Sequence, residues 1–174
     1  MELIYLDHNA TTPLAPAAAA AMARCQAEVC GNPASQHAAG RRARRVLEEA
    51  RDEIGRMLGA DLQRFEADRV IFTSGGTDSN HLALFGLAGL GRAGDRPGHA
   101  IVSAIEHPSV VGPARWLARH GWQIDWLGAR IDGRIDADAL PALLRPETRF
   151  VSAMLGNNET GVMQPIARLA EHCS

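Results

Sequence analysis

Short apolar runs alternate with segments of helical periodicity from residue 69 onward, and this alternation constrains the fold more than any other feature. The predicted strands cover residues 69–73, 99–105, 122–127 and 149–155, and the predicted helices cover 77–90, 109–120, 136–144 and 166–173. Consecutive strands joined through helices require right-handed crossovers, which give a mainly parallel sheet with helices on both faces. We therefore predict an α/β fold in which a ligand binds beyond the carboxyl ends of the strands.

The chain before residue 69 is predicted to be helical, over about residues 17–29 and 37–58. In the longer helix, apolar residues recur at helical spacing and form one face: Val46, Leu47, Ala50, Ile54, Met57 and Leu58. Its first turns carry a basic cluster that could contact nucleic acid: Arg41, Arg42, Arg44 and Arg45. Because Arg44 and Arg45 stand four residues before glutamates, we interpret the cluster as a solvated, ion-paired face.

The composition is that of a globular protein. The 174 residues are 46% hydrophobic and 22% charged, and the net charge of −2 gives no reason to expect nucleic acid or a membrane surface as a partner. No apolar run reaches the roughly 18 residues that span a bilayer, and the N-terminus lacks the pattern of a signal peptide. We expect a cytoplasmic protein.

The three cysteines give an odd number with no disulfide framework, which fits a reducing compartment. Cys25 and Cys30, with His37 beyond them, have poor spacing for a zinc site. We expect no metal, and we interpret the cysteines as buried or inert thiols.

A glycine pair follows the first predicted strand, in the segment from Val70 to Asn80. Gly75 and Gly76 let the backbone approach a ligand closely, and Thr77 is a suitable N-cap for the helix that follows. The start of a helix offers unpaired N–H groups and positive potential, which favour a phosphate. The segment lacks the P-loop pattern, and an ordinary tight strand-to-helix turn is the alternative interpretation.

Two further polar loops follow predicted strands, at residues 106–109 and 156–161, and parallel strands bring both to the same sheet edge as the glycine turn. Together the loops offer a phosphate site, the flat imidazole of His107 and the amides of Asn157 and Asn158. This combination suits a planar phosphorylated cofactor. Taken singly, the histidine could be structural and the asparagines could serve a turn.

The chain resembles the cysteine desulfurases, which are pyridoxal-phosphate enzymes of fold type I in the class V aminotransferase group. The matching stretches are YLDHNATTP at 5–13, GNPASQH at 31–37, FTSGGTDSN at 72–80, EH at 106–107, NNETG at 157–161 and QPI at 164–166. They occur in the family's order and cover essentially the whole sequence. The resemblance implies an N-terminal arm at residues 1–14, which forms the active-site entrance segment. It also implies a partial large domain at 15–174 that binds pyridoxal phosphate and is truncated at its C-terminal end.

The resemblance also implies roles for individual residues. Gly76 and Thr77 match the positions that bind the phosphate of pyridoxal 5′-phosphate. His107 matches the histidine that stacks on the pyridine ring and assists proton transfer, and Asn158 matches the asparagine beside cofactor and substrate. Residues 9–11 match a segment that lines the active-site entrance.

The implied reaction removes sulfur from L-cysteine, leaving alanine and a protein persulfide that supplies an acceptor protein or iron–sulfur cluster assembly. Family members are homodimers. In the family, a lysine binds the cofactor covalently, an aspartate pairs with the pyridine nitrogen and a loop cysteine takes the sulfur, and none of the three matches a residue here. The sequence contains no lysine at all, because its 18 basic residues are arginines. We therefore expect this 174-residue chain to be inactive by itself.

Four other interpretations stay open. Within the class V group, the chain could belong to a selenocysteine lyase or another aminotransferase. In a different class, it could be a non-catalytic remnant or a phosphate-binding module.

Overall fold

The computed structural model describes residues 4–63, 67–91 and 96–173. The chain divides into two compact units, Met1–Phe72 and Thr73–Ser174, which we describe separately and call the first and second units. The predicted division into residues 1–14 and 15–174 stays a prediction, and its residues 1–3, 64–66, 92–95 and 174 lie outside the described ranges. Within those ranges, no helix combines the length and apolar character needed to cross a membrane.

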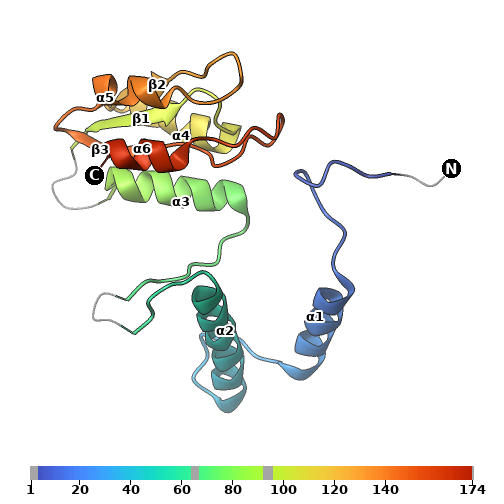
Figure 1. Cartoon of the computed structure of the whole chain (residues 1–174). Helices are drawn as coiled ribbons and strands as arrows, with labels where there is room; N and C mark the ends of the chain where they lie inside the picture. The colour runs from blue at the N-terminus through green and yellow to red at the C-terminus, as the bar shows by residue number, and fades with distance from the viewer. Residues whose placement is uncertain (1–3, 64–66, 92–95, 174) are drawn as a thin grey trace. The chain divides into compact units, whose positions relative to one another are not determined.

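The second unit contains a parallel sheet of strands β1 (His99–Ser103), β2 (Gln123–Leu127) and β3 (Thr148–Ser152). Their order is β2-β1-β3, so β1 lies in the middle, and all five of its residues are buried. The α/β fold and the parallel sheet predicted from the sequence are confirmed (Figure 1).

Helices cover both faces of this sheet, as predicted. Helices α3 (Gly76–Ala88) and α4 (Pro108–Arg119) enclose one core cluster, whose buried members include Leu84, Ala88, Ala100, Val102, Val110, Ala114, Leu117, Trp122 and Phe150. The short 3-10 helix η1 (Ala137–Ala139), α5 (Leu140–Leu143) and α6 (Ile166–His172) enclose the other, formed by Ile101, Leu127, Ile135, Ala137, Leu140 and Leu169.

The helix predicted over 136–144 is in fact divided between η1 and α5. Pro141 lies in the first turn of α5. Proline is accepted there, but it has no N–H and restricts the residue before it, so a continuous helix through this point is disfavoured.

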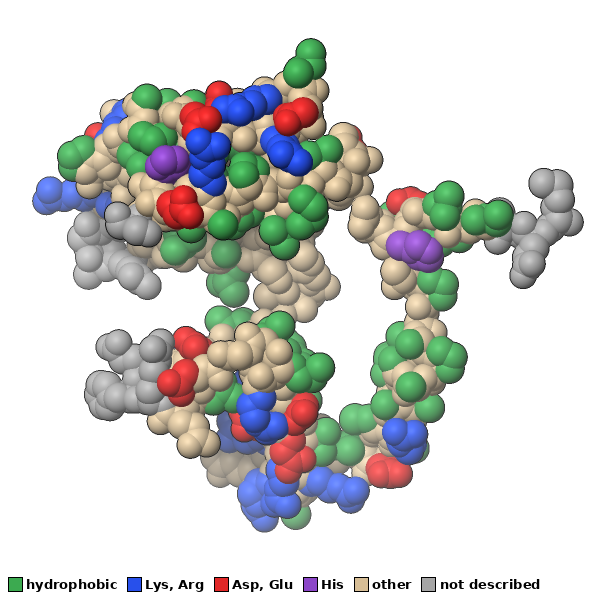
Figure 2. Space-filling view, viewed as in Figure 1, with side chains coloured by type: hydrophobic (Ala, Val, Ile, Leu, Met, Phe, Trp, Pro, Cys, Tyr) green, Lys and Arg blue, Asp and Glu red, His purple; other side chains and the backbone are tan. Residues whose placement is uncertain are grey.

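The first unit consists of α1 (Pro16–Glu28), α2 (Ala38–Met57) and connecting segments. Helix α1 has no buried residue, and hydrophobic side chains lie at its surface in Figure 2. Helix α2 buries Gly40, Ala43 and Gly55, whereas Met57 of the predicted apolar face is 78% exposed. Both helices were predicted correctly, but the apolar face of α2 is largely uncovered within the described part of the chain.

The strand predicted over 69–73 was wrong, because residues 70–73 have no strand pairing. The side chain of Arg51 in α2 instead contacts this segment, with Nη1 donating to the Val70 carbonyl oxygen at 2.5 Å and the guanidinium carbon 4.8 Å from the centre of the Phe72 ring. An apolar run becomes a strand only where another strand satisfies its backbone groups. No such partner exists for this run among the described residues.

The three cysteines are free thiols, and all are exposed. Of the interpretation as buried or inert thiols, burial was therefore wrong, and inertness stays a prediction. Cys25 lies on α1, which packs against nothing that would cover it in the described chain.

Candidate functional site

The glycine turn leads directly into α3. Gly75 is the N-cap residue and Gly76 the first helical residue, so Thr77 lies inside the first turn and the prediction that it caps the helix was wrong. The first intrahelical bond runs from the Ser79 amide to the Gly75 carbonyl oxygen, at 3.0 Å. The amides of Gly76 and Thr77 precede that bond and have no acceptor within the helix, which makes this end of α3 suited to an anion.

The space beside these amides is open. A Cβ placed on Gly75 or Gly76 would meet nothing within 4 Å, so packing does not require glycine at either position. The carboxylate of Asp78 bonds to the Ser74 amide at 3.2 Å and thus occupies the turn rather than the amides of Gly76 and Thr77. The residues present therefore fit a phosphate group.

His107 lies at the N-terminus of α4, where its side chain serves as the N-cap. The ring nitrogen Nδ1 accepts from the Ser109 amide at 3.1 Å and lies 2.7 Å from the Ser109 hydroxyl oxygen. These two contacts hold one edge of the imidazole on the helix, while the residue as a whole stays exposed. The ring is thus oriented and accessible.

A side-chain bond connects the glycine turn to this histidine. Asn80, in the first turns of α3, donates from Nδ2 to the Ser109 hydroxyl oxygen at 2.8 Å. Residues three or four apart lie on the same face of a helix, so Gly76 and Thr77 stand one turn, about 5 Å, from Asn80 along α3. The structure therefore brings the predicted phosphate positions and His107 together.

The loop after β3 is attached to the loop that carries His107. The Met154 amide donates to Glu106 Oε1 at 2.6 Å, and Asn157 Nδ2 donates to the Ile105 carbonyl oxygen at 3.3 Å. Asn157 Oδ1 also accepts from the Glu159 amide at 3.0 Å, forming the turn that contains Asn158. The structure thus places Asn158 in a loop that is tied to the residues beside His107.

Burial raises the pKa of the Glu106 carboxyl, and this effect outweighs the opposing hydrogen bonds from the Met154 amide and the Ser103 hydroxyl. Removing a carboxylate from water disfavours its charged form. The carboxyl that joins the two loops is consequently harder to ionise than an exposed one.

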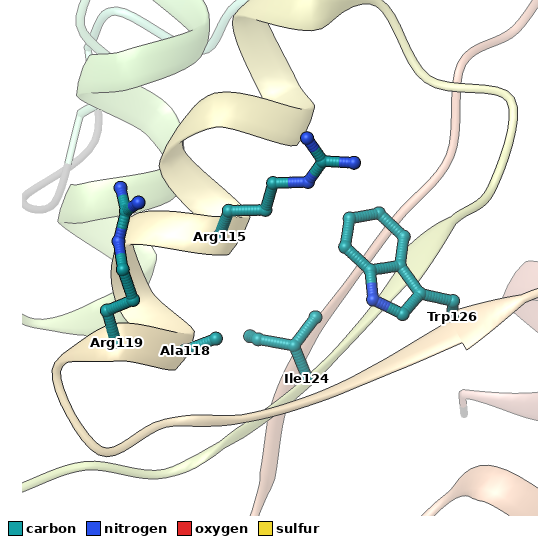
Figure 3. A pocket seen from close by; sticks show the side chains of 5 residues that line it. All are labelled: Arg115, Ala118, Arg119, Ile124 and Trp126. Carbon is teal, nitrogen blue, oxygen red and sulfur yellow. The ribbon is translucent and has the colours of Figure 1, made fainter.

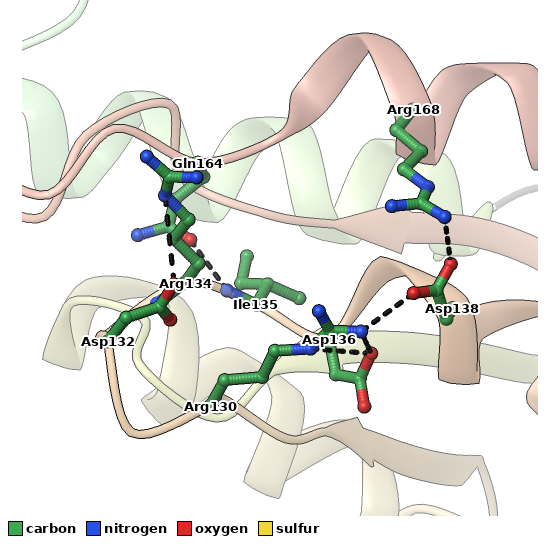
Figure 4. A network of polar contacts seen from close by, with 8 residues as sticks. All are labelled: Arg130, Asp132, Arg134, Ile135, Asp136, Asp138, Gln164 and Arg168. Atoms are coloured by element: carbon green, nitrogen blue, oxygen red, sulfur yellow. Dashed lines mark hydrogen bonds and ion pairs between the residues drawn. The ribbon is translucent and has the colours of Figure 1, made fainter.

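Gln164 lies at the end of the loop that contains Asn157 and Asn158 and holds it through backbone contacts. It is 6% exposed, its Oε1 accepts from the Ile135 amide at 2.8 Å, and its Nε2 donates to the carbonyl oxygens of Gly133 and Val162, both at 3.1 Å. One side chain therefore satisfies three backbone groups of two neighbouring segments. Figure 4 shows its bond to Ile135.

An exposed ion-pair network lies beside Gln164 (Figure 4). Arg130 contacts Asp136 at 2.6 Å and Asp138 at 2.7 Å, and Arg168 of α6 also pairs with Asp138. The guanidinium of Arg130 holds the pKa of Asp138 below its usual value. Because these groups are exposed, the network adds little stability and is weakened by salt.

Four residues that the structure places at the site had no role in the predictions from sequence: Asn80, Ser109, Glu106 and Gln164. Helical spacing from Thr77 would have indicated Asn80. Adjacency to His107 would have indicated Glu106. Gln164 is far in sequence from residues 133 and 135, so no local sequence pattern indicates its contacts with them.

A separate pocket of about 370 Å³ lies between the C-terminal half of α4 and β2 (Figure 3). Arg115 and Arg119 extend from the helix, and Ile124 and Trp126 face them from the strand. Arg119 is twelve residues from His107, which corresponds to about 18 Å along the helix axis. The pocket is therefore not part of the candidate site.

The predicted segment at residues 9–11 belongs to the first unit. The amides of Ala10 and Thr11 donate to the Asp7 carbonyl oxygen at 3.2 and 3.4 Å, which forms a turn. Its role at the active-site entrance stays a prediction.

Known proteins resemble the chain over nearly its whole length. The cysteine desulfurase IscS of Dictyoglomus turgidum is 40% identical over 169 residues, covering 97% of this chain and 41% of that protein. The solved structure of a NifS-like protein superposes with a TM-score of 0.86 at 28% identity, covering 97% of this chain and 44% of the other. A structure described as SspA in complex with cysteine has a TM-score of 0.82 at 29% identity and covers 97% of this chain and 47% of the other.

The sequence profile of the family described as aminotransferase class-V matches residues 4–174. The chain spans about two fifths of the length of the curated relatives that it matches, at 41% of the Dictyoglomus protein. The chain therefore belongs to the class V aminotransferase family and matches an N-terminal part of its cysteine desulfurases.

Proposed function

We propose that this chain supplies the phosphate site and the ring-stacking histidine of a cysteine desulfurase that uses pyridoxal 5′-phosphate. One observation carries the proposal: Asn80 connects the start of α3 to Ser109 and His107 through a hydrogen bond of 2.8 Å. The amides of Gly76 and Thr77 stand about one helical turn from Asn80, and Asn80 is bonded to the serine that holds the accessible imidazole. That arrangement suits a ligand with a phosphate on a planar ring.

Each residue has a defined task in this proposal. The amides of Gly76 and Thr77 bind the phosphate, His107 lies against the ring and moves a proton, and the Asn158 amide orients the ligand. Pyridoxal phosphate, when bound, supplies an electron sink for bond cleavage in amino acids. The loops after β1 and β3 hold these groups in place through Glu106 and Asn157.

The substrate that we propose is L-cysteine, whose sulfur passes from its carbon to a protein thiol, giving a persulfide on that thiol and alanine. Relatives named cysteine desulfurase support this choice, as does a structural neighbour described in complex with cysteine. A cytoplasmic homodimer that passes sulfur to an acceptor protein completes the proposal by analogy with the family.

The 174-residue polypeptide should release neither sulfide nor alanine from L-cysteine. It has no lysine to bind the cofactor covalently, because all 18 basic residues are arginines. The measurement is sulfide and alanine production by the purified polypeptide with added cofactor. Turnover above a boiled control would refute the inactivity.

Cofactor binding can be tested with pyridoxamine 5′-phosphate, which lacks the aldehyde that would react with the terminal amine. We expect it to shift the amide NMR signals of Gly76, Thr77 and His107, and pyridoxamine without phosphate to bind at least about tenfold more weakly. Ligand-induced shifts confined to other residues would contradict the proposed site.

Two variants of one glycine isolate the amide donor. Gly76→Pro deletes the N–H at the first helical position, where proline is tolerated, and should weaken binding about tenfold or more. Gly76→Ala retains the N–H, adds a Cβ into open space and should bind as the unaltered chain does. Equal affinities for the two variants would show that this amide does not hold the phosphate.

A further inference from the structure

The imidazole of His107 makes two contacts through one ring nitrogen. Nδ1 lies 3.1 Å from the Ser109 amide nitrogen and 2.7 Å from the Ser109 hydroxyl oxygen. Ser109 is 6% exposed, so water does not compete freely for its hydroxyl. The protonation of Nδ1 is therefore decided by the direction of these two hydrogen bonds.

Asn80 favours one direction of the hydroxyl bond. Its amide nitrogen, 2.8 Å from the Ser109 hydroxyl oxygen, can only donate, so the hydroxyl oxygen accepts there. The hydroxyl proton stays available for His107 Nδ1, which can accept it when unprotonated. The Ser109 backbone amide also can only donate to Nδ1. Both donors require an unprotonated Nδ1.

We propose that Asn80 and Ser109 are positioning residues that keep neutral His107 in the tautomer with its proton on Nε2. A proton on Nδ1 would face the Ser109 backbone N–H and would deprive the Ser109 hydroxyl proton of Nδ1 as its acceptor. The site thus presents a single ring nitrogen, Nε2, for proton exchange with a ligand on the exposed side of the ring. The inference deepens the proposed function, because it names the atom through which His107 acts there.

The tautomer can be measured directly by NMR on the full chain labelled with ¹⁵N-histidine, at a pH where the imidazole is neutral. We expect the signals of His107 to show a proton on Nε2. Ser109→Ala removes one of the two donors and should raise the share of the Nδ1–H tautomer about two- to tenfold, which corresponds to one hydrogen bond. Ser109→Thr retains a hydroxyl and should restore the original ratio.

Asn80→Asp provides a sharper test, because it nearly preserves size but replaces the donor with an acceptor. The Ser109 hydroxyl would then donate to the carboxylate and accept from Nδ1–H, so the tautomer ratio should shift further than in Ser109→Ala. Ser152→Ala is the matched control, since this β3 serine has no hydrogen bond to a histidine in the described structure and should leave the ratio unchanged.

A wild-type His107 with its proton on Nδ1 would overturn the inference, even if a variant failed to fold. An unchanged ratio in both Ser109→Ala and Asn80→Asp, with dispersed amide spectra that show folded protein, would also overturn it. Affinity for pyridoxamine 5′-phosphate is measured on the same samples. A chain with the Nε2–H tautomer but no affinity would refute the proposed function and leave the tautomer assignment intact.

Discussion

The two units of this chain have helices of similar regularity but differ in what those helices bury. In the second unit, both faces of β1 are covered, and Ile101 and Leu117 are completely buried. In the first unit, α1 buries no residue and the Ile54 side chain of α2 is 38% exposed. The sequence patterns of α1 and α2 are thus sufficient to predict these helices. They do not show whether the apolar side chains of the helices become buried.

The chain offers separate probes for the two units. Its three tryptophans, Trp116, Trp122 and Trp126, all lie in the second unit, so intrinsic tryptophan fluorescence reports on that unit alone. The far-UV circular dichroism includes α1 and α2 as well. The two signals can therefore be compared on one sample.

The largest expected difference is between two isoleucines. Ile101→Ala should lower the free energy of unfolding of the second unit by about 2–5 kcal/mol, because it leaves a cavity among fully buried side chains. Ile54→Ala should cost less than about 1 kcal/mol, since its side chain is partly exposed and alanine favours the helix. Urea unfolding followed by fluorescence and circular dichroism measures both. Equal losses would remove the distinction between the units.

The next largest effect is expected for Gln164→Ala, which should lower the free energy of unfolding by about 1–3 kcal/mol. The substitution leaves the buried Ile135 amide without its acceptor and two carbonyl oxygens without their donor. Gln123→Ala is the control, because Gln123 is exposed and, among the described residues, its side-chain oxygen accepts from the exposed Arg145 alone. The urea midpoints of the two variants should differ clearly. If they coincide, Gln164 does not support the loop.

A pair of helical glycines tests packing in each unit. Gly112→Ala should stabilise α4 by about 0.5–1 kcal/mol, because a Cβ there meets nothing within 4 Å. Gly40→Ala should instead disturb α2, because its Cβ would clash with the Ser35 carbonyl oxygen. Thermal melts followed by circular dichroism should move in opposite directions. A stabilising effect of Gly40→Ala would show that α2 does not pack on residue 35.

The smallest effect concerns pH. The pKa of Glu106 is raised in the folded state from the ordinary value of 4.5, so the folded chain binds this proton more tightly than the unfolded chain. The stability contributed by the protonated carboxyl is therefore lost as pH rises from about 4.5 through the raised pKa. Glu106→Gln removes this loss and retains an acceptor for the Met154 amide.

The gain in stability of Glu106→Gln over the unaltered chain should accordingly grow with pH and then level off. Urea midpoints of the two proteins at several pH values measure it, and the contributions of the other carboxyls cancel in the difference. A difference that does not vary with pH would mean that Glu106 is solvated like an exposed carboxyl.

Features that depend on neighbouring residues were predicted from the sequence, whereas features that depend on contacts between distant residues were not. The parallel strands, the helices on both faces and the position of His107 at the start of α4 were predicted, because periodicity and strand–loop order are local properties. Thr77 was misplaced by two positions as a cap, since Gly75 takes that place. The predicted strand over 69–73 failed because its hydrogen-bond partner cannot be identified from its own residues.

The sequence by itself determined most of the elements, the family, and the sheet edge at which the loops after β1 and β3 gather. Only the tertiary structure showed that Asn80 donates a hydrogen bond to Ser109, the residue that contacts His107, and that Glu106 accepts one from the Met154 amide. Periodicity is encoded within a few neighbouring residues, whereas these bonds join residues 29 and 48 positions apart. Their existence depends on how β1, β3, α3 and α4 pack, which no local pattern records.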